Sequence, residues 1–529
     1  MYYCEGEGMS LNSRWVAVAL SLLAFTAGSA EADVCDPRDF GAVGDGMHDD
    51  TDAVQVALDA CIGGGTVEVS PGTYLIRPIV FHGDGLTLRL DFGATLLGSP
   101  NLIDYAANMN LIFANGKSDI AIVGAGTIDG SGPAFWGTEP RPRLIRLRRC
   151  ERVLVQGVTL QNSPTFHLVP EDSNDVTIDN VTILAPPNSP NTDGIDPGGR
   201  NINISNCYID NGDDNIAIKA GTGVHVDGVT VRDCTFLHGH GLSMGSDLNG
   251  GVENFVAQNI SFDGTDNGLR IKTDRTHGGV VRNLSYDIIT MRNVGRIIDI
   301  AGYYPELTIP PPFTDPPQPI TDTTPQYSNI SVSNLVSEGG GHGSPNGAFF
   351  IGVPEAPLTG LVLQNVAIDR AARRFELRNV EVQRCNVTVN SGFQFDENVT
   401  ITDEGCDNDG YSLSLCDDSQ TVEQGGTTTF EVTVTPSGGF QGPVSFRVSG
   451  LPGMSNSFDP PVVQDSGFTT LTLLTSNLTP AGTFPLTITA TSGDSGRFNR
   501  IAVATLVVVE ALPDLDLGQR GEVPAKAHQ

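Results

Sequence analysis

Apolar and polar residues alternate over short runs between residues 120 and 390, and one such run recurs along the chain. Each copy has a polar residue, an apolar residue, a Thr, Ser or similar residue, and a second apolar residue. The first apolar residue of successive copies is Val158, Val181, Cys207, Cys234, Ile260, Ile289, Leu335 and Val366. The first five steps are 23 to 29 residues long, and the sixth spans 46 because it includes the proline-rich stretch 305–325. Alternation with period two predicts strands with one inward face, and its recurrence predicts a solenoid of stacked strands.

Among the kinds of solenoid fold, this alternation favours a parallel β-helix. A single coil cannot bury its apolar residues alone, so successive coils stack around a common interior. A leucine-rich repeat is the competing solenoid, but the chain lacks its L-x-x-L-x-L spacing. Residues 49–61 are expected to form a short helix that caps the N-terminal end of the stack, with Val54, Ala57, Leu58 and Cys61 on one face.

The pattern changes near residue 409. Alternating runs at 430–434, 444–448 and 486–490 are separated by turn clusters such as 436–439. About 100 residues of this kind are typical of an immunoglobulin-like β-sandwich, so the whole chain is predicted to be all-β. The two tryptophans, Trp15 and Trp136, both lie outside this segment, which favours a spacer over a sugar-binding module.

The first residues have the pattern of a secretory signal peptide. Arg14 precedes the apolar run 15–25, and Ala30-Glu31-Ala32 is an A-x-A cleavage site. The expected organisation is a signal peptide at 1–32, a β-helix at 33–408, a sandwich at 409–512 and a disordered tail at 513–529. No later stretch is long and apolar enough for a membrane helix. We therefore expect the protein to be secreted and extracellular. We also expect it to be a monomer.

Composition and charge narrow the possible partners. Hydrophobic residues make up 39% and charged residues 17%, as in globular proteins. The 30 basic and 62 acidic residues give a formal charge of −32, which argues against a nucleic-acid partner because polyphosphates need a clustered basic surface.

Cysteine usage agrees with export. Eight cysteines follow the signal peptide, and Cys35 with Cys61 and Cys406 with Cys416 are plausible disulfide pairs, although spacing alone leaves the connectivity open. No C-x-x-C spacing occurs, so zinc is not expected, and the sequence predicts neither a metal nor a cofactor.

When the predicted coils are aligned by their strands, the candidate functional residues fall into one row along the solenoid. The residues two positions before the first apolar residue of four strands are Asp193, Asp214, His240 and Asn267, in steps of 21, 26 and 27 residues. Neighbouring coils lie about 4.7–4.9 Å apart, so the first three should be contiguous, with Asp213 beside them. Arg270 and Lys272 should face outward one coil further on.

Three carboxylates, a histidine, an arginine and a lysine suit hydrolysis of an acidic sugar polymer. Crowded carboxylates cannot all ionise freely, so one pKa rises and that group can donate a proton, while an ionised neighbour activates water. Arg270 and Lys272 would pair with substrate carboxylates. Gly212-Asp213-Asp214 alone is usually a turn, and Arg270-Ile271-Lys272 alone is usually a solvated strand face. Their alignment on consecutive coils is what favours function.

The motifs Asn191-Thr192-Asp193, Gly212-Asp213-Asp214, Gly239-His240-Gly241 and Arg270-Ile271-Lys272 have the order and spacing seen in polygalacturonases, glycoside hydrolase family 28. Segments 39–46, 126–130 and 162–167 resemble the family too, so the resemblance covers about residues 33–400. It implies a right-handed parallel β-helix that hydrolyses α-1,4-galacturonosyl linkages of homogalacturonan with inversion.

The resemblance also implies roles. Asp213 would be the general acid, Asp193 and Asp214 would hold and activate the water, and His240 would tune the acid. The substrate-binding residues would be Asn191, Arg270, Lys272 and Tyr304, where Tyr303 is the alternative to Tyr304. Near the cleft, Arg275 and Lys219 would help to reverse the local negative field.

Three other functions are compatible with parts of the pattern. A pectate-lyase-like eliminase shares the β-helix but needs a calcium site and a basic proton abstractor. A hydrolase of rhamnogalacturonan or xylogalacturonan is the nearest competitor, against which His240 and the Arg-Ile-Lys triplet argue. A non-catalytic adhesin would bind sugar and release no reducing ends.

Overall fold

The computed structural model describes residues 33–106, 108–304, 315–338, 347–368, 375–389, 394–395, 398–403, 410–417, 419–437, 440–449, 455–475, 479, 482–492 and 498–509. The expected signal peptide and tail lie outside these residues. The chain divides into two compact units between residues 406 and 407, and each is described by itself.

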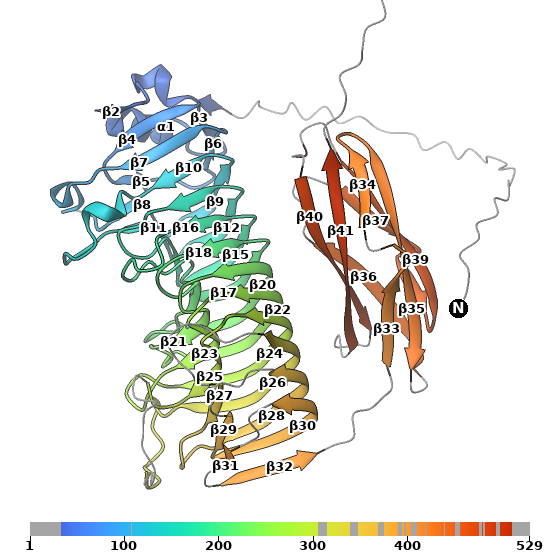
Figure 1. Cartoon of the computed structure of the whole chain (residues 1–529). Helices are drawn as coiled ribbons and strands as arrows, with labels where there is room; N and C mark the ends of the chain where they lie inside the picture. The colour runs from blue at the N-terminus through green and yellow to red at the C-terminus, as the bar shows by residue number, and fades with distance from the viewer. Residues whose placement is uncertain are drawn as a thin grey trace, which may run out of the picture. The chain divides into compact units, whose positions relative to one another are not determined.

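The first unit is a parallel β-helix, as predicted (Figure 1). Its larger sheet, here called the back sheet, has 21 strands that pair in parallel. They are β1 (Val34–Cys35), β2 (Asp45–Asp49), β3 (Thr66–Val69), β4 (Gly72–Ile76), β6 (Thr87–Leu90), β7 (Ala94–Gly98), β9 (Ser118–Gly124), β10 (Thr127–Asp129), β12 (Glu151–Gln156), β13 (Thr159–Gln161), β15 (Ser173–Asp179), β16 (Thr182–Leu184), β17 (Gly199–Ser205), β18 (Tyr208–Asp210), β20 (Val226–Leu237), β22 (Val252–Asp263), β24 (Val280–Arg292), β26 (Gln326–Glu338), β28 (Leu358–Ile368), β30 (Val380–Val389) and β32 (Val399–Asp403).

A second row of short parallel strands, here called the front sheet, carries the site. Its strands are β5 (Ile79–Phe81), β8 (Asn110–Asn115), β11 (Arg143–Arg148), β14 (Leu168–Glu171), β19 (Ile216–Ile218), β21 (Leu242–Gly245), β23 (Asn267–Lys272), β25 (Arg296–Ala301), β27 (Ala348–Ile351), β29 (Phe375–Arg378) and β31 (Gln394–Phe395). Bridges from Ile195 to Leu168 and to Ile216 join its two parts into one continuous row.

The repeat read from the sequence is in register in the structure. The residue after the first apolar position of each copy pairs with its counterpart one coil on, giving the row Thr159, Thr182, Tyr208, Thr235, Ser261, Thr290, Val336 and Ala367. The flanking residues point inward and are buried, and all are apolar except Ser337, which takes an apolar place in one of the later copies and is buried as well. Burial of these stacked side chains in the interior therefore stabilises the solenoid.

The N-terminal end is closed as expected by α1 (Thr51–Ala60), which buries Val54, Ala57 and Leu58 (Figure 1). The predicted Cys35–Cys61 disulfide is formed beside it. Three short 3₁₀ helices, η1 (Pro37–Phe40), η2 (Leu102–Tyr105) and η3 (Gly132–Ala134), complete the helical part of the described chain.

The other suggested disulfide, Cys406 with Cys416, is wrong. The Cys416 thiol donates a hydrogen bond to Glu431 Oε1 at 3.1 Å and belongs to no disulfide. Cys385 is disulfide-bonded instead, to a residue outside the described part of the chain. Spacing along the chain suggested the wrong pair because the winding of the backbone decides which thiols meet.

The second unit contains two further sheets. One has β33 (Gly410–Leu415), β35 (Thr427–Ser437), β39 (Gly467–Leu474) and β37 (Ser455–Asp459), and the other has β34 (Ser419–Glu423), β41 (Phe498–Val509), β40 (Gly482–Ser492), β36 (Pro443–Ser449) and β38 (Val462–Gln464). All pairs are antiparallel except β34 with β41. Phe430 and Leu471 from one sheet share a core with Ile488 and Leu506 from the other.

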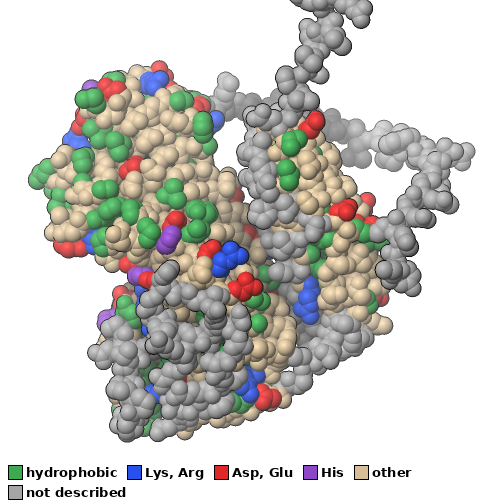
Figure 2. All heavy atoms as spheres, in the orientation of Figure 1, with side chains coloured by type: hydrophobic (Ala, Val, Ile, Leu, Met, Phe, Trp, Pro, Cys, Tyr) green, Lys and Arg blue, Asp and Glu red, His purple; other side chains and the backbone are tan. Residues whose placement is uncertain are grey.

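Among the residues described, none of the helices has the length and apolar character that crossing a membrane requires. Figure 2 shows acidic and basic side chains scattered over the visible face, with no large area of one sign among the coloured atoms.

Candidate active site

The predicted row of functional side chains is formed. Ile195, Ile216 and Leu242 pair on successive coils, so Asp193, Asp214 and His240, each two residues earlier, follow one another along the front sheet. A cleft of about 310 Å³ opens over this row. It is lined by Phe166, Asn191, Asp193, Asp213, Lys219, His240, Asp266, Asn267, Arg270, Lys272 and Tyr304. Seven of the eight predicted site residues therefore line one cleft, and the eighth, Asp214, is buried directly beneath it.

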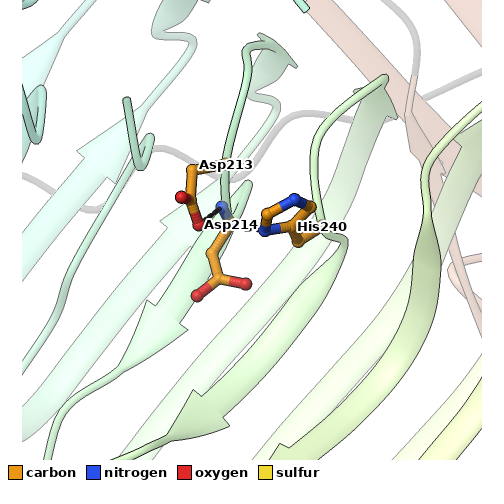
Figure 3. A group of neighbouring side chains, drawn as sticks. All are labelled: Asp213, Asp214 and His240. Carbon is orange, nitrogen blue, oxygen red and sulfur yellow. Dashed lines mark hydrogen bonds and ion pairs between the residues drawn. The ribbon is translucent and has the colours of Figure 1, made fainter. Parts of the chain in front are cut away.

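Asp213 and His240 form a partly buried, hydrogen-bonded pair at the cleft. Asp213 lies in the turn between β18 and β19 and His240 in the turn before β21, one coil away (Figure 3). His240 Nδ1 lies 3.0 Å from Asp213 Oδ1, and the Asn191 amide donates to Asp213 Oδ2 at 3.4 Å. The Asp214 side chain points away from Asp213, toward the strand that bears the cations (Figure 3).

Asp214 is fully buried but well paired. Lys272 Nζ donates to its Oδ2 at 2.6 Å, the Ser243 hydroxyl donates to its Oδ1 at 2.7 Å, and an Arg270 Nη1 lies 3.7 Å away. Both cations come from β23, two coils further along the front sheet. The alternation on that strand aims Arg270 and Lys272 into the cleft while Leu269 and Ile271 fill the interior.

Asp193 lacks such partners and is joined by an acid that the sequence reasoning missed. Asp193 and Asp196 are both buried, and Oδ1 of each has no hydrogen-bond partner among the described residues. The Lys219 ammonium lies between them, 3.8 Å from one and 3.9 Å from the other. Burial and the charges of neighbouring carboxylates raise the pKa of Asp193 well above its ordinary value, and burial raises the pKa of Asp196 to about 6.

The carboxyl with the raised pKa is therefore not the one that the resemblance names as the acid. Burial raises the pKa of Asp213, but the hydrogen bond and charge of His240, with smaller contributions from the Asp214 N–H and Lys272, outweigh it and lower the pKa to about 2. The same hydrogen bond raises the pKa of His240. One proton thus belongs to the Asp213–His240 pair as a unit and rests on the imidazole in the empty cleft.

The glycines beside His240 are required by geometry. Gly239 and Gly241 have φ of +70° and +79°. A Cβ on Gly239 would overlap the Asp213 carbonyl oxygen and Asn211 Oδ1, and one on Gly241 would overlap the Asn267 carbonyl oxygen. Gly-His-Gly therefore lets the histidine turn press against the preceding carboxylate turn.

Two buried asparagines hold these turns together, and the sequence reasoning missed both. Asn211 donates to the carbonyl oxygens of Thr192 and Asp214 at 2.8 and 2.9 Å. Asn215 donates to Asn211 Oδ1 and accepts from the Gly241 N–H, both at 2.9 Å. The three turns that bear Asp193, Asp213 and His240 are thus linked by side-chain amides, and the signal for this in the sequence is the pair of asparagines that flanks the Gly212-Asp213-Asp214 motif.

Three further residues in or beside the cleft were not predicted from the sequence. Phe166 occupies the Asp193 row one coil earlier, a position that the sequence alignment of coils did not reach. Arg141 lies in a loop with its side chain 5% exposed and donates to Asn191 Oδ1 at 2.8 Å, which orients the amide that faces Asp213. Asp266, also in the cleft, lies 3.6 Å from His240 Nε2.

The choice between the two tyrosines follows from their neighbours. The Tyr304 ring lies beneath the cations of Arg270 and Lys272, at 5.4 and 5.7 Å from its centroid. Tyr303 instead donates to Asp315 Oδ2 at 2.7 Å. The expectation that Arg275 offsets the negative field of the cleft is wrong, because its guanidinium is bound by Asp315 and Glu355 outside the cleft.

The nearest potential metal ligands are those of Asp213, Asp214 and His240, whose ligand atoms all lie within 4.8 Å of one another. The Lys272 ammonium already neutralises Asp214 and the imidazole already binds Asp213. A cation would have to displace both contacts.

A row of carboxylates in the groove of a parallel β-helix is an arrangement that suits a glycoside hydrolase. Residues 67–386 match the model of Glycosyl hydrolases family 28, and the chain belongs to that family. It is thus an enzyme of the polygalacturonase type, as the sequence predicted.

Two curated relatives and a solved structure agree. The chain is 30% identical over 411 residues to a polygalacturonase of Ralstonia solanacearum, covering 62% of this chain and 74% of that one. It is 31% identical over 325 residues to an endo-polygalacturonase of Pectobacterium parmentieri, covering 54% and 77%. The structure of a polygalacturonase from Erwinia carotovora superposes with a TM-score of 0.54 at 27% identity, covering 70% of this chain and 97% of that one.

Proposed function

We propose that this protein is a secreted enzyme that hydrolyses the α-1,4-galacturonosyl linkages of homogalacturonan with inversion of configuration. The observation that carries the proposal is one cleft in which the Asp213–His240 pair faces Arg270 and Lys272. The pair supplies acid chemistry, and the two cations suit the carboxylate of a uronic acid. Relatives named polygalacturonase support the choice of substrate.

The proton is delivered through Asp213. As a galacturonate chain enters, its own carboxylates and the loss of water favour the neutral form of Asp213, so the proton of the pair moves from His240 Nδ1 to the carboxyl. Asp213 then donates it to the oxygen of the glycosidic bond as that bond to the anomeric carbon breaks. His240 thereby sets how much of the acid form is present.

The water is held by the carboxylates deeper in the row. Asp193 Oδ1 has an unused acceptor position, and Asp214 is held by Lys272 and Ser243. These two residues hold the water, and Asp214 accepts its proton as the water oxygen bonds to the anomeric carbon. Arg270, Lys272 and Tyr304 hold the sugar next to the bond that breaks, and Asn191 orients Asp213.

The stereochemical part of the proposal has a direct test. Asp213 and Asp214 have carboxyl oxygens within 4.8 Å of each other, closer than the roughly 6.5–9.5 Å usual between the acid and base of inverting enzymes. Inversion therefore requires the water to be held across the cleft from the acid, with Asp193, one coil earlier in the same row, taking part. Proton NMR of fresh product distinguishes the outcomes, because inversion gives the β-anomer first and retention gives the α-anomer.

The remaining parts of the chain are assigned by their sequence patterns. We propose that residues 1–32 direct secretion, that residues 409–512 form an immunoglobulin-like spacer, and that the mature enzyme acts as a monomer. Two facing sheets with a shared core support the spacer. N-terminal sequencing of secreted protein, expected to begin at Asp33, tests the cleavage site, and light scattering tests the monomer.

The decisive experiment replaces the acid. Asp213→Asn keeps the size of the side chain and removes its proton chemistry, so release of reducing ends from polygalacturonate should fall by about a thousandfold or more. Asp227→Asn, on the back sheet in the ladder with Asn254, is the matched control and should keep full activity. Retention of most of the activity by Asp213→Asn would overturn the acid assignment.

The same assay separates hydrolysis from elimination. Hydrolysis gives reducing ends without ultraviolet absorbance, and a chelator should leave the rate unchanged. An absorbing unsaturated product, lost on chelation, would instead identify a lyase.

A further inference from the structure

A row of arginines lies on the front sheet beyond the cleft, toward the N-terminal coils. On β11, Arg146 and Arg148 alternate with the buried residues Ile145 and Leu147 and so lie on the outward face, whereas Arg143 lies at the start of the strand, two residues before Ile145, and is partly buried. The strand register carries the row of Arg146 through Val169 and Ser243 to Arg270, which lines the cleft, so this outward face is also the one that bears the cleft.

The arginines of this row are not equally neutralised. Glu171 of β14 pairs with Arg146 at 2.5 Å and with Arg148 at 3.4 Å. Arg143 has neither an ion pair nor a side-chain hydrogen bond to any residue in the described part of the chain. Its guanidinium lies over the Phe166 ring, 5.5 Å from the centroid. Among the described residues, three arginines of this row thus share one paired carboxylate, Glu171, and the row keeps net positive charge.

Phe166 connects this charge to the active site. Its ring lines the cleft, and the Lys219 ammonium lies 5.9 Å from the same centroid. Hydrogen bonds from Leu144 N to the Phe166 carbonyl and from His167 N to the Asp193 carbonyl put Arg143, Phe166 and Asp193 on three consecutive coils of one row. Two coil steps, about 9–10 Å, thus separate Arg143 from Asp193.

We propose that Arg143 and Phe166 form an additional subsite that binds a uronate residue of the polymer, on the opposite side of the catalytic carboxylates from Arg270 and Lys272. The sugar face packs on the Phe166 ring and its carboxylate pairs with the Arg143 guanidinium. This inference rests on the proposed function and extends it.

The arrangement also determines the length of substrate that the cleft prefers. Cations flank the carboxylate row at both ends, and five coil steps, about 24 Å, separate Arg143 from Arg270. Only an oligomer of several uronates reaches both. In a chain with formal charge −32, these two groups of cations are what draws a polyanion into the groove at both ends.

The test measures affinity against chain length. In the Asp213→Asn background, calorimetry gives the affinity for oligogalacturonates of two to six units, with and without Arg143→Met. The methionine keeps the aliphatic packing and removes the charge. Arg143→Met should weaken binding of the longer oligomers about tenfold and leave the dimer unchanged, and full methyl esterification of the oligomers should abolish the difference.

The controls keep the result decisive. Arg200→Met, an exposed arginine on the back sheet, should leave all affinities unchanged. If Arg143→Met lowers the melting temperature, Arg143→Gln and Arg143→Lys replace it, and only the lysine variant should retain part of the length effect. Equal affinities for Arg143 and its neutral variants at every length would overturn the subsite.

The unsubstituted chain is assayed on polygalacturonate in parallel. Hydrolysis together with a flat length profile rejects the subsite alone. Absence of both hydrolysis and oligogalacturonate binding rejects the proposed function, and the subsite with it.

Discussion

Each ionisable side chain in the cleft has a charge state set by its immediate neighbours. Asp214 is paired with Lys272, whereas Asp193 shares one lysine with Asp196, and burial with the neighbouring carboxylates raises its pKa. Asp213 and His240 are hydrogen-bonded, which lowers the pKa of the carboxyl and raises that of the imidazole. In the proposed mechanism the acid is therefore this pair of residues, and its working range depends on the histidine.

The first prediction concerns that working range. The pKa of His240 is raised in the folded protein, so the pair keeps its proton above pH 6.5 and loses it as pH rises through the raised pKa. The stabilisation from the ion pair is likewise complete below pH 6.5 and lost over the same range. We expect kcat to fall along that limb, and His240→Asn to lower kcat by about a hundredfold and move the limb to lower pH.

His238 supplies the matched control for this profile. It pairs with Asp210 at 2.7 Å, is half exposed and lies outside the cleft lining. His238→Asn should leave the profile unchanged. If both histidine variants kept the wild-type alkaline limb, another group would be responsible for it.

At the scale of elements, the front strands position the site and the turns between them supply most of its chemistry. Strands bring one residue per coil to the same row, whereas Asp213, Asp214 and His240 come from turns that must approach one another closely. Glycine at left-handed φ and the Asn211–Asn215 amide links make that approach possible.

The second prediction compares two glycines in equivalent turns. Gly239 and Gly264 both have positive φ, but a Cβ on Gly264 meets nothing within 4 Å. Gly264→Ala should cost only the left-handed backbone penalty, about 1–2 kcal/mol, with full activity. Gly239→Ala should cost more and also lower kcat, because the new methyl displaces the Asp213 turn.

Urea denaturation and initial rates on the same preparations check this pair. Equal loss of stability with unchanged kcat in both variants would contradict the role of close packing at Gly239.

At the scale of the molecule, all residues assigned to the reaction lie in the β-helix. The cleft lining runs from Phe166 to Tyr304, within the unit that ends at residue 406. The third prediction follows: a chain that ends at residue 406 should keep kcat on soluble polygalacturonate within about twofold of the full chain. Rates of both proteins at equal active concentration test this, and a loss of tenfold or more would show that residues 407–529 take part in the reaction.

Much of this architecture could be predicted because the solenoid repeats. Val158, Val181 and Cys207 recur at nearly constant spacing, and a parallel stack turns equal spacing into spatial contact. The same alignment predicts that Asp193, Asp214 and His240 share one row, and the structure places them there. Contacts outside that row could not be predicted from the repeat. Arg141 approaches from a loop, and the partners of Arg275, Asp315 and Glu355, are 40 and 80 residues away from it along the chain.

What the amino-acid order decided by itself is periodicity: which residues face inward on each coil, and which polar groups fall on consecutive coils. Only the tertiary structure decided how those groups share charge. It separates two adjacent aspartates into a partly buried partner of an imidazole and a fully buried partner of a lysine. It also withdraws Arg275 from the cleft and leaves Arg143 without an ion pair to any described residue. Register follows from local spacing, whereas proton affinity and free charge depend on distances and burial set by the whole fold.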